Sequence, residues 1–151
     1  MKIITANDRI NECLEIRYKV FVDEQNVPVE LEKDEFDETG SGCDHFLIIE
    51  NGQTIGTFRC MFEDEKTVHL QRLCILKEYR GKDFGRKALE FADEYCKKKN
   101  ADVITLNAQC YAIPFYEKSG YTVISDVFDD AGIDHRTMKK VASCQLPVAS
   151  C

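Results

Sequence analysis

The chain opens with hydrophobic residues at helical spacing and changes near residue 44 to the alternating pattern of strands. After a short predicted strand at residues 2–5, the apolar positions between residues 10 and 21 lie on one face of a predicted helix, which Asn7 or Asp8 can cap. Arg17 falls on this apolar face. Because a buried arginine needs an anionic partner, Arg17 either forms an internal salt bridge or lines a ligand cleft.

The middle of the chain predicts an antiparallel meander of three strands, at residues 46–50, 53–62 and 67–76. Asn51-Gly52, between the first two strands, is a strong signal for a two-residue hairpin. The acidic segment that precedes the meander contains Pro28, so we expect a broken helical or loop segment there.

The second half predicts a helix at residues 84–99 and a strand at residues 102–106. Strand, helix and strand at this length form a parallel crossover unit. A short helix at residues 112–119 and two closing strands, at residues 121–125 and 136–141, complete the pattern.

These elements predict a mixed α/β (α+β) fold class. We expect a mixed, mostly antiparallel sheet of six to seven strands with helices on both faces. A single domain is expected over residues 1–141, followed by a loosely ordered tail at residues 142–151.

Composition narrows the function classes. At 151 residues and 44% hydrophobic content, the chain resembles a globular domain, and its net charge of −7 argues against a nucleic-acid partner. No apolar run approaches the roughly 20 residues of a membrane span, and residues 1–8 lack a signal-peptide core. We therefore expect a cytoplasmic protein without a membrane partner, as a monomer or homodimer.

The cysteines and histidines do not predict a metal or redox centre. The eight cysteines form no C-x-x-C pair, and the three histidines show no ligand spacing. Most of the cysteines lie inside apolar patterns, where a reduced thiol acts as a small hydrophobic side chain. Cys74 has no neighbouring histidine to activate it, so a core thiol is favoured over a nucleophile.

The exception in this acidic chain is a basic turn at residues 80–87, RGKDFGRK, which crowds cations and glycines around the start of a predicted helix. A helix N-terminus offers backbone N–H groups and a positive dipole. The turn therefore predicts an anion site, most naturally for the phosphate of a small ligand.

The order strand, R-G-K-x-x-G-R, helix, strand and then A-I-P-F-Y-E-K-S-G-Y resembles the GNAT superfamily of acetyl-CoA-dependent N-acetyltransferases. The likeness spans residues 2–141, and the segments around Arg17, Arg72 and His135 resemble the small bacterial ElaA/YjcF-like subgroup. The resemblance implies the GNAT fold. It also implies transfer of an acetyl group from CoA sulfur to a primary amine of a small molecule or peptide, by direct attack through a tetrahedral intermediate.

Acetyl-CoA is the implied co-substrate, with no metal. In the superfamily a loop equivalent to Arg80–Gly85 wraps the CoA pyrophosphate with backbone amides, and Asp83 stands here in place of the middle glycine. Aspartate keeps the backbone N–H, so we expect CoA binding to be retained but weaker, with Asp83 turned outward. The resemblance implies cofactor contacts from Leu73, Cys74, Ile75, Arg80, Gly81, Lys82, Asp83, Phe84, Gly85, Arg86, Asn107, Gln109, Ala112, Phe115 and Tyr116.

Tyr116 is the implied general acid, because a phenol with a pKa near 10 can protonate a departing thiolate. The alternative is a core tyrosine with a satisfied hydroxyl. Glu24 or His135 is the candidate base that takes the proton of the amine. The acceptor side is expected to involve Arg17, Phe21, Gln25, Asp37, His45 and Arg72.

Two alternatives stay open at this point. Arg72 implies an acceptor with a carboxylate or phosphate if it faces the cleft, whereas it is structural if it pairs with a buried acid such as Asp37. The second alternative concerns the whole protein, which could be a non-catalytic acyl-CoA-binding or sensory domain. The departure at Asp83 and the lack of an obvious base are the two observations that keep this alternative open.

Overall fold

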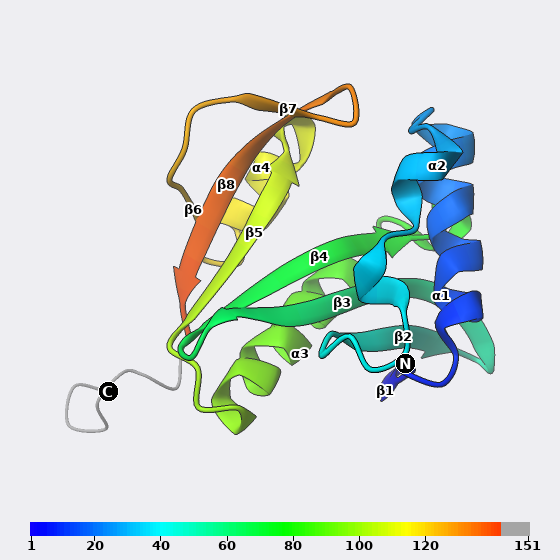
Figure 1. Cartoon of the computed structure of the whole chain (residues 1–151), viewed down its shortest axis with the longest axis horizontal. Helices are drawn as coiled ribbons and strands as arrows, with labels where there is room; N and C mark the ends of the chain where they lie inside the picture. Colours follow the sequence, from blue (N-terminus) through cyan, green and yellow to red (C-terminus); the bar gives the residue numbers. More distant parts are fainter. Residues whose placement is uncertain (143–151) are drawn as a thin grey trace. The chain divides into compact units, whose positions relative to one another are not determined.

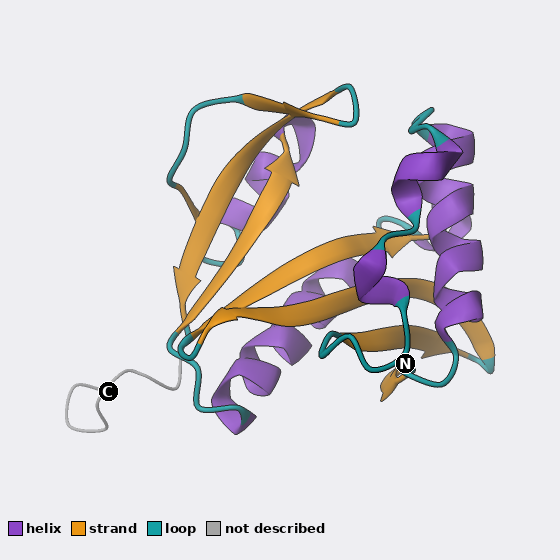
Figure 2. Cartoon of the chain, in the orientation of Figure 1, coloured by secondary structure: helices purple, strands orange, loops and turns teal. Residues whose placement is uncertain are grey.

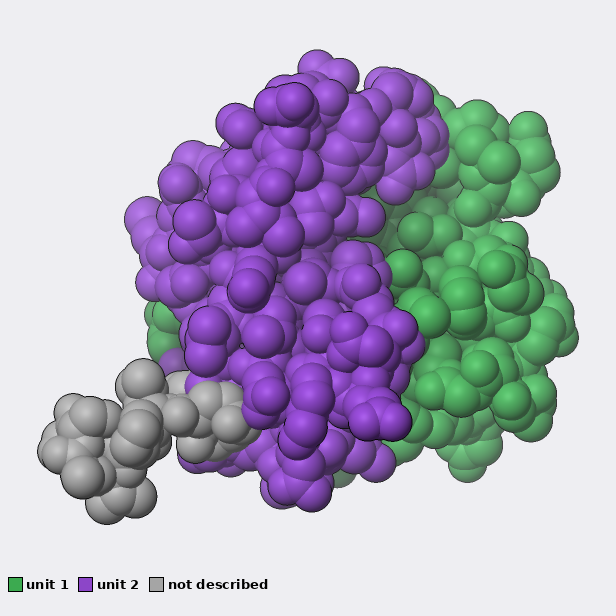
Figure 3. All heavy atoms as spheres, turned by 60° about the vertical axis from the view of Figure 1, so that its left-hand side comes forward, with its two compact units in different colours: residues 1–61, 71–88 green, residues 62–70, 89–151 purple. Residues whose placement is uncertain are grey.

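A computed structural model describes residues 1–142 of the chain, shown in Figure 1 and coloured by secondary structure in Figure 2. Two compact units are distinguished in Figure 3. Unit 1 comprises residues 1–61 and 71–88, and unit 2 comprises residues 62–70 and the chain from residue 89 onward. Strands β3 (Gln53–Asp64) and β4 (Thr67–Ile75) and helix α3 (Phe84–Lys98) each run from one unit into the other.

The described residues form one sheet of eight strands, in the order β1-β2-β3-β4-β5-β8-β6, with β7 paired to β8. The pairing of β4 with β5 is parallel, whereas the other registered pairs are antiparallel. This arrangement confirms the predicted mixed, mostly antiparallel fold class. The very short strand β6 (Thr122–Val123) lies inside the expected strand at residues 121–125, and the eighth strand, beyond the expected six to seven, is β7 (Phe128–Asp130), which pairs with β8.

Unit 1 begins with β1 (Lys2–Thr5) and α1 (Ile10–Arg17), followed by a π-helical segment, η1 (Tyr18–Glu24). The predicted side-chain cap of α1 is wrong: no side chain caps this helix. The Asn7 side chain instead donates to Asp44 and accepts from the backbone N–H of His45. The acidic segment after η1 holds two short helices, α2 (Val29–Glu32) and η2 (Glu35–Asp37).

Strand β2 (Asp44–Glu50) is covered on both faces, because Phe46, Leu47, Ile48 and Ile49 are all buried. Leu47 and Ile49 belong to a cluster that also contains Cys13, Ile16 and Val20 from the first helical segment. The predicted hairpin at Asn51-Gly52 is confirmed: both residues have positive φ, 51° and 77°, as a type I′ turn requires. Burial on both faces makes β2 a rigid support for the helices and loops of unit 1.

Strand β4 carries two features that matter for the site. Its parallel pairing with β5 (Val103–Gln109) covers Thr67–Leu70, while β5 continues to Gln109 paired with β8 (Ile133–Val141). Two residues after Leu70, Arg72 has a φ of 59°, in the left-handed region. The strand then ends at Ile75, and η3 (Lys77–Tyr79) leads into the basic turn.

Unit 2 is organised around β5, which pairs with β4 on one side and with β8 on the other. After β5 come η4 (Cys110–Ala112) and α4 (Ile113–Glu117), which lie within the predicted short helical region. Strand β7 was not expected from the sequence, because residues 126–135 are acidic and rich in turn formers. Its backbone nevertheless pairs with β8 from Phe128 to Asp130.

The expected single domain over residues 1–141 stays a prediction. The expected tail lies outside the described residues except for Ala142, which is buried and donates its backbone N–H to the carbonyl of Asp102. Among residues 1–142, no helix is both long enough and apolar enough to cross a membrane.

Candidate functional site

The basic turn has the backbone of an anion-binding loop. Gly81 and Asp83 both have positive φ, 77° and 70°, and α3 begins directly afterwards at Phe84. The first N–H groups of a helix lack acceptors inside the helix, and the helix dipole makes that end positive. The left-handed conformation at Asp83 gives a physical reason for a glycine at this position, since glycine adopts it freely. Asp83 keeps its carbonyl in the helix, where it accepts from the N–H of Lys87 at 3.1 Å.

The Arg80 side chain folds back along the end of β4. Its Nε donates to the carbonyl of Ile75 at 2.8 Å, and its two terminal nitrogens each lie 2.9 Å from a carboxylate oxygen of Glu24. This bidentate ion pair joins the end of η1 to the basic turn within unit 1. The Arg80 guanidinium is thus already paired with a carboxylate, which belongs to the candidate base Glu24.

The other side chains of the turn are arranged around its aromatic residues. Phe84 is buried and meets Tyr79 edge to face, with ring centroids 6.3 Å apart, while the Lys82 ammonium lies 5.8 Å from the Tyr79 ring centroid. The exposed Asp83 carboxylate lies 3.5 Å from the guanidinium of Arg86. The aromatic anchor therefore fixes the start of α3 while the charged ends stay accessible.

Leu73, Cys74 and Ile75 form the last part of β4, and their backbone is tightly packed against β3. A Cβ atom at Gly56 would lie 2.8 Å from the Cys74 carbonyl oxygen, so only glycine fits there. Cys74 is buried, and burial raises the pKa of its thiol far above the ordinary value. A thiol with such a pKa is not a thiolate nucleophile at neutral pH, which supports the core-thiol interpretation.

Arg17 forms the internal salt bridge that was one of its two expected roles. Its side chain is 2% exposed, and it donates to Glu32 Oε2 at 2.8 Å, to the Glu32 carbonyl at 2.7 Å and to both carboxylate oxygens of Asp37 at 2.6 and 3.0 Å. Burial acts to lower the pKa of the guanidinium, but the two carboxylates outweigh it and raise that pKa. Arg17 is thus a buried, fully charged group.

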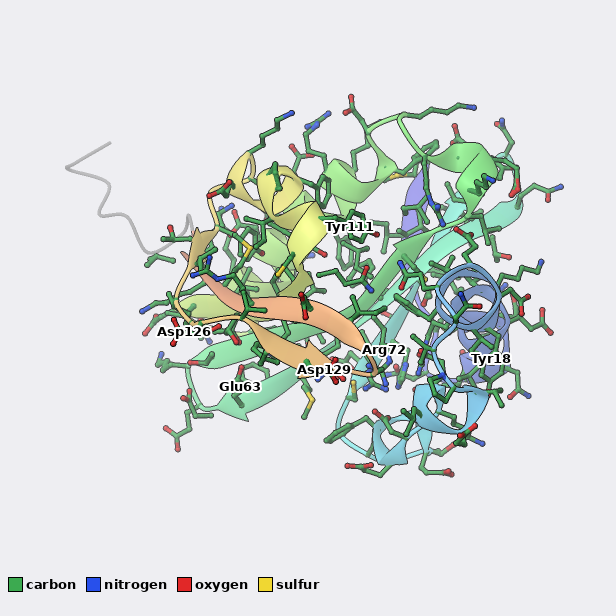
Figure 4. All side chains as sticks on the ribbon, turned by 90° about the horizontal axis from the view of Figure 1, so that it is seen from above. Tyr18, Glu63, Arg72, Tyr111, Asp126 and Asp129 are labelled. Carbon is green, nitrogen blue, oxygen red and sulfur yellow. The ribbon has the colours of Figure 1, made fainter. Side chains whose placement is uncertain are left out.

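Arg59 and Arg72 join the same network. Arg59 donates to the carboxylates of Asp34 and Asp37, at 2.7–3.0 Å, and its guanidinium lies 5.5 Å from the Phe36 ring centroid. Arg72, labelled in Figure 4, has Nε 2.8 Å from Glu32 Oε2. Three arginines therefore face three carboxylates, from Glu32, Asp34 and Asp37, and their formal charges cancel.

Asp37 is the centre of this buried ion network. Burial alone would raise the pKa of its carboxyl, but the hydrogen bonds from Arg17 and from the Asp34 backbone, with the charges of Arg17 and Arg59, lower it to about 2. His45 lies 4.0 Å from Asp37, and burial lowers the pKa of its imidazole. His45 Nε2 donates to the Phe36 carbonyl at 2.9 Å, and its Nδ1 faces Asp37.

The remaining acceptor-side candidates also lie in unit 1. Phe21 packs against the hydrophobic cluster of α1 and β2. Gln25 follows η1, and its backbone N–H donates to the carbonyl of Val20 at 3.2 Å. Unit 1 thus holds all six expected acceptor residues, and three of them, Arg17, Asp37 and Arg72, belong to the ion network.

In unit 2, Tyr116 lies on α4 and is half-buried. It meets Phe115 and Tyr121 edge to face, with ring centroids 5.0 and 6.0 Å apart. Phe115, another implied cofactor contact, is half-buried as well. Ala112, one turn earlier, ends η4.

Polar residues of β5 and β8 make up the rest of the unit 2 candidates. Asn107 accepts from the Thr137 hydroxyl at 2.8 Å, and Gln109, the last residue of β5, pairs with His135 of β8. His135 is buried, stacks on Phe128 and has Nδ1 2.7 Å from the Ile133 carbonyl. A carbonyl only accepts, so Nδ1 carries the proton and Nε2 is the basic nitrogen of the neutral ring.

Two groups were missed at the level of sequence. Glu32 is 3% exposed and forms ion pairs with two arginines, yet it resembles its exposed acidic neighbours in the chain. In unit 2, His69 Nδ1 lies 2.7 Å from the Thr105 hydroxyl and 2.8 Å from Glu63, and that hydroxyl also donates to Glu63. Within residues 1–142, no group of three or more His, Cys, Asp or Glu side chains is arranged to hold a metal ion.

Comparisons with known proteins agree with this geometry. A family model described as an acetyltransferase (GNAT) domain matches residues 9–142. The uncharacterized N-acetyltransferase YjcF of Bacillus subtilis is 34% identical over 143 residues, which cover 93% of this chain and 99% of that protein. The crystal structure of Escherichia coli ElaA superposes with a TM-score of 0.79 at 25% identity, covering 92% of this chain and 97% of ElaA.

A more distant structure was solved with its ligand. A GNAT family acetyltransferase from Elizabethkingia anophelis, with acetyl-CoA bound, shares the fold with a TM-score of 0.59 at 13% identity. The alignment covers 67% of this chain and 77% of that one.

Proposed function

The chain belongs to the GNAT acetyltransferase family, and we propose that it transfers the acetyl group of acetyl-CoA to the primary amine of a small molecule or peptide. The observation that carries this proposal is the start of α3. Two left-handed residues, Gly81 and Asp83, precede a helix N-terminus that is flanked by Arg80, Lys82 and Arg86. Those residues fit a pyrophosphate, because backbone N–H groups and cations are what such an anion requires.

The backbone of unit 1 supplies the cofactor contacts in this proposal. Acetyl-CoA, when bound, supplies an activated thioester. The N–H groups at the start of α3 would bind its pyrophosphate, and the backbone of Leu73–Ile75 would bond the pantetheine arm. Backbone recognition suits these residues, because their side chains are apolar and Cys74 is buried. Glu24 must release Arg80 if that guanidinium is to reach a phosphate.

Tyr116 is the proposed general acid, donating a proton to the CoA thiolate as it leaves. For the base we favour His135 over Glu24. The His135 Nδ1–H is taken by the Ile133 carbonyl, which leaves Nε2 to accept the proton of the amine, whereas both carboxylate oxygens of Glu24 are occupied by Arg80. The amine then attacks the thioester carbonyl directly, with no acyl-enzyme at Cys74.

The charge balance of the ion network bears on the acceptor. Arg17, Arg59 and Arg72 are each paired with buried or half-buried carboxylates, so the network offers no excess positive charge. A carboxylate or phosphate on the acceptor would find no uncompensated cation there. We therefore propose an amine acceptor without an anionic group next to the reacting nitrogen.

The test is release of CoA from acetyl-CoA over a panel of amines and short peptides. CoA is quantified by chromatography rather than with thiol reagents, because such reagents also detect protein cysteines, of which the chain has eight. Turnover with any amine supports the enzyme, whereas CoA binding without turnover would favour the non-catalytic alternative. Tyr116→Phe should lower kcat by 10²-fold or so with little change in KM for acetyl-CoA, whereas an unchanged kcat removes the general-acid role.

A further inference from the structure

Arg72 has an unusual backbone for a residue inside a strand. Its φ of 59° lies in the left-handed region, which residues with a Cβ rarely adopt. A single residue of this kind bends a strand and re-aims the peptide that follows it. In β4 that peptide leads into Leu73, the first of the three residues assigned to the pantetheine arm. The conformation of Arg72 therefore sets the direction of the backbone groups of that stretch.

The Arg72 side chain is anchored at its far end. Nη2 donates to the Glu32 carbonyl at 3.1 Å and lies 3.5 Å from Asp34. Nε forms an ion pair with Glu32 Oε2 at 2.8 Å but makes no hydrogen bond within residues 1–142. Glu32 is itself buried and held by Arg17 at 2.8 Å. A strained backbone persists where the surroundings over-determine it, and this anchor is such a surrounding.

The following residues are held from the other side of the strand. The Cys74 carbonyl oxygen lies against Gly56 of β3, where a Cβ atom would come within 2.8 Å. The N–H of Leu76 donates to the Ile55 carbonyl at 2.8 Å. Leu73 thus lies between two fixed points, the Glu32 anchor of Arg72 and the packing of Cys74 on β3.

We propose that Arg72 is a positioning residue for acetyl-CoA: anchored on Glu32, it holds β4 in the bent conformation that presents the Leu73 backbone to the cofactor. This inference rests on the proposed function. It gives Arg72 a role that requires no contact with the acceptor, in contrast to the role expected from the sequence. Acetyl-CoA binding depends on the backbone conformation of Arg72, and the side chain maintains that conformation.

Two substitutions at this position separate the backbone from the side chain. Arg72→Gly and Arg72→Ala both remove the guanidinium, but glycine adopts a φ of 59° freely and alanine does not. Isothermal titration with CoA should show that Arg72→Gly binds about tenfold more tightly than Arg72→Ala. Equal CoA affinity of the two variants would overturn the inference, and a rise in acceptor KM common to both would identify Arg72 as an acceptor contact instead.

A second pair of variants tests the anchor. Glu32→Gln, which keeps the size of the side chain but removes its charge, should weaken CoA binding in the Arg72 protein and change it less than twofold in the Arg72→Gly background. A loss of the same size in both backgrounds contradicts the anchor. Arg9→Ala, which removes a half-buried arginine paired with Glu12 in the same unit, is the matched control.

The wild-type titration distinguishes a failure of the proposed function from a failure of the positioning role of Arg72. If the wild-type protein binds no CoA, the proposed function fails and this inference fails with it. If the wild type binds CoA and the glycine and alanine variants do not differ, only the inference fails. Circular dichroism and thermal unfolding of each variant establish that a lost affinity does not reflect an unfolded protein.

Discussion

Asp83→Gly is the substitution that tests the basic turn most directly, because Asp83 holds a left-handed backbone and a carboxylate at the same position. An L-residue in this region is strained by about 1–2 kcal/mol, with aspartate near the lower end. Glycine removes that strain, but its freedom in the unfolded chain takes back about 0.5–1 kcal/mol. We therefore expect a small gain, about 0.5 kcal/mol, in the free energy of unfolding.

The larger expected effect is on ligand affinity. The Asp83 carboxylate, 68% exposed, lies 3.5 Å from Arg86, and exposed pairs of this kind are worth about 0.2–1 kcal/mol. Its removal leaves Arg86 available to an incoming phosphate and removes a negative charge next to the helix start. Asp83→Gly should thus tighten CoA binding by about two- to fivefold.

Titration calorimetry with CoA and urea unfolding of the same samples measure both quantities. Asp83→Asn isolates the charge, since asparagine tolerates the left-handed region, and it should reproduce most of the gain in affinity. Asp83→Ala also removes the charge, but alanine tolerates the left-handed region less well than asparagine or glycine, so it should be the least stable of the three variants. Weaker CoA binding by Asp83→Gly than by the wild type would refute the reasoning.

Three further outcomes are expected in unit 1. Asp37→Asn should lower the free energy of unfolding at pH 7 by about 2 kcal/mol or more in urea titrations, since Arg17 and Arg59 lose their shared carboxylate. In the wild type, this contribution should be lost as pH falls from about 4, the ordinary pKa of a carboxyl, through the folded-state pKa of about 2. The free energy of unfolding of Asp37→Asn should therefore depend less on pH in this range. Glu30→Gln, a control at an exposed carboxylate, should keep the wild-type pH dependence. Gly56→Ala should cost about 1–3 kcal/mol in the same assay, because its methyl group collides with the Cys74 carbonyl, and unchanged stability would mean that β3 and β4 can separate there. Cys74→Ala should keep kcat within about threefold, because a buried thiol with a raised pKa is no nucleophile, and abolished turnover in a folded variant would contradict this.

The sequence predicted features that depend on neighbouring residues, and it missed features that depend on residues far apart in the chain. The Asn51-Gly52 turn and the start of α3 depend on neighbouring residues, so their patterns sufficed. The need of Arg17 for an anionic partner followed from its place on an apolar helix face. The identity of these acidic partners could not be predicted in the same way, because Glu32 and Asp37 lie 15 and 20 residues away in the chain.

Two local features also escaped the sequence patterns. Nothing about an arginine signals the left-handed backbone of Arg72, which depends on contacts with residues 38–40 positions earlier in the chain. The expected cap at Asn7 was wrong because its side chain bonds Asp44 and His45 instead. Competition between local and long-range partners for one polar group cannot be decided from neighbouring residues alone.

The buried ion network has a consequence for how this sequence can vary. Arg17 and Arg59 share Asp37, and Arg17 and Arg72 share Glu32. Replacing one member with a neutral residue therefore leaves two other members without one of their oppositely charged partners. Neutral drift at these positions should therefore proceed by joint replacement of acid and base rather than one residue at a time. Across related sequences, the three arginines and their three carboxylates should therefore co-vary, so that all six are present or absent together.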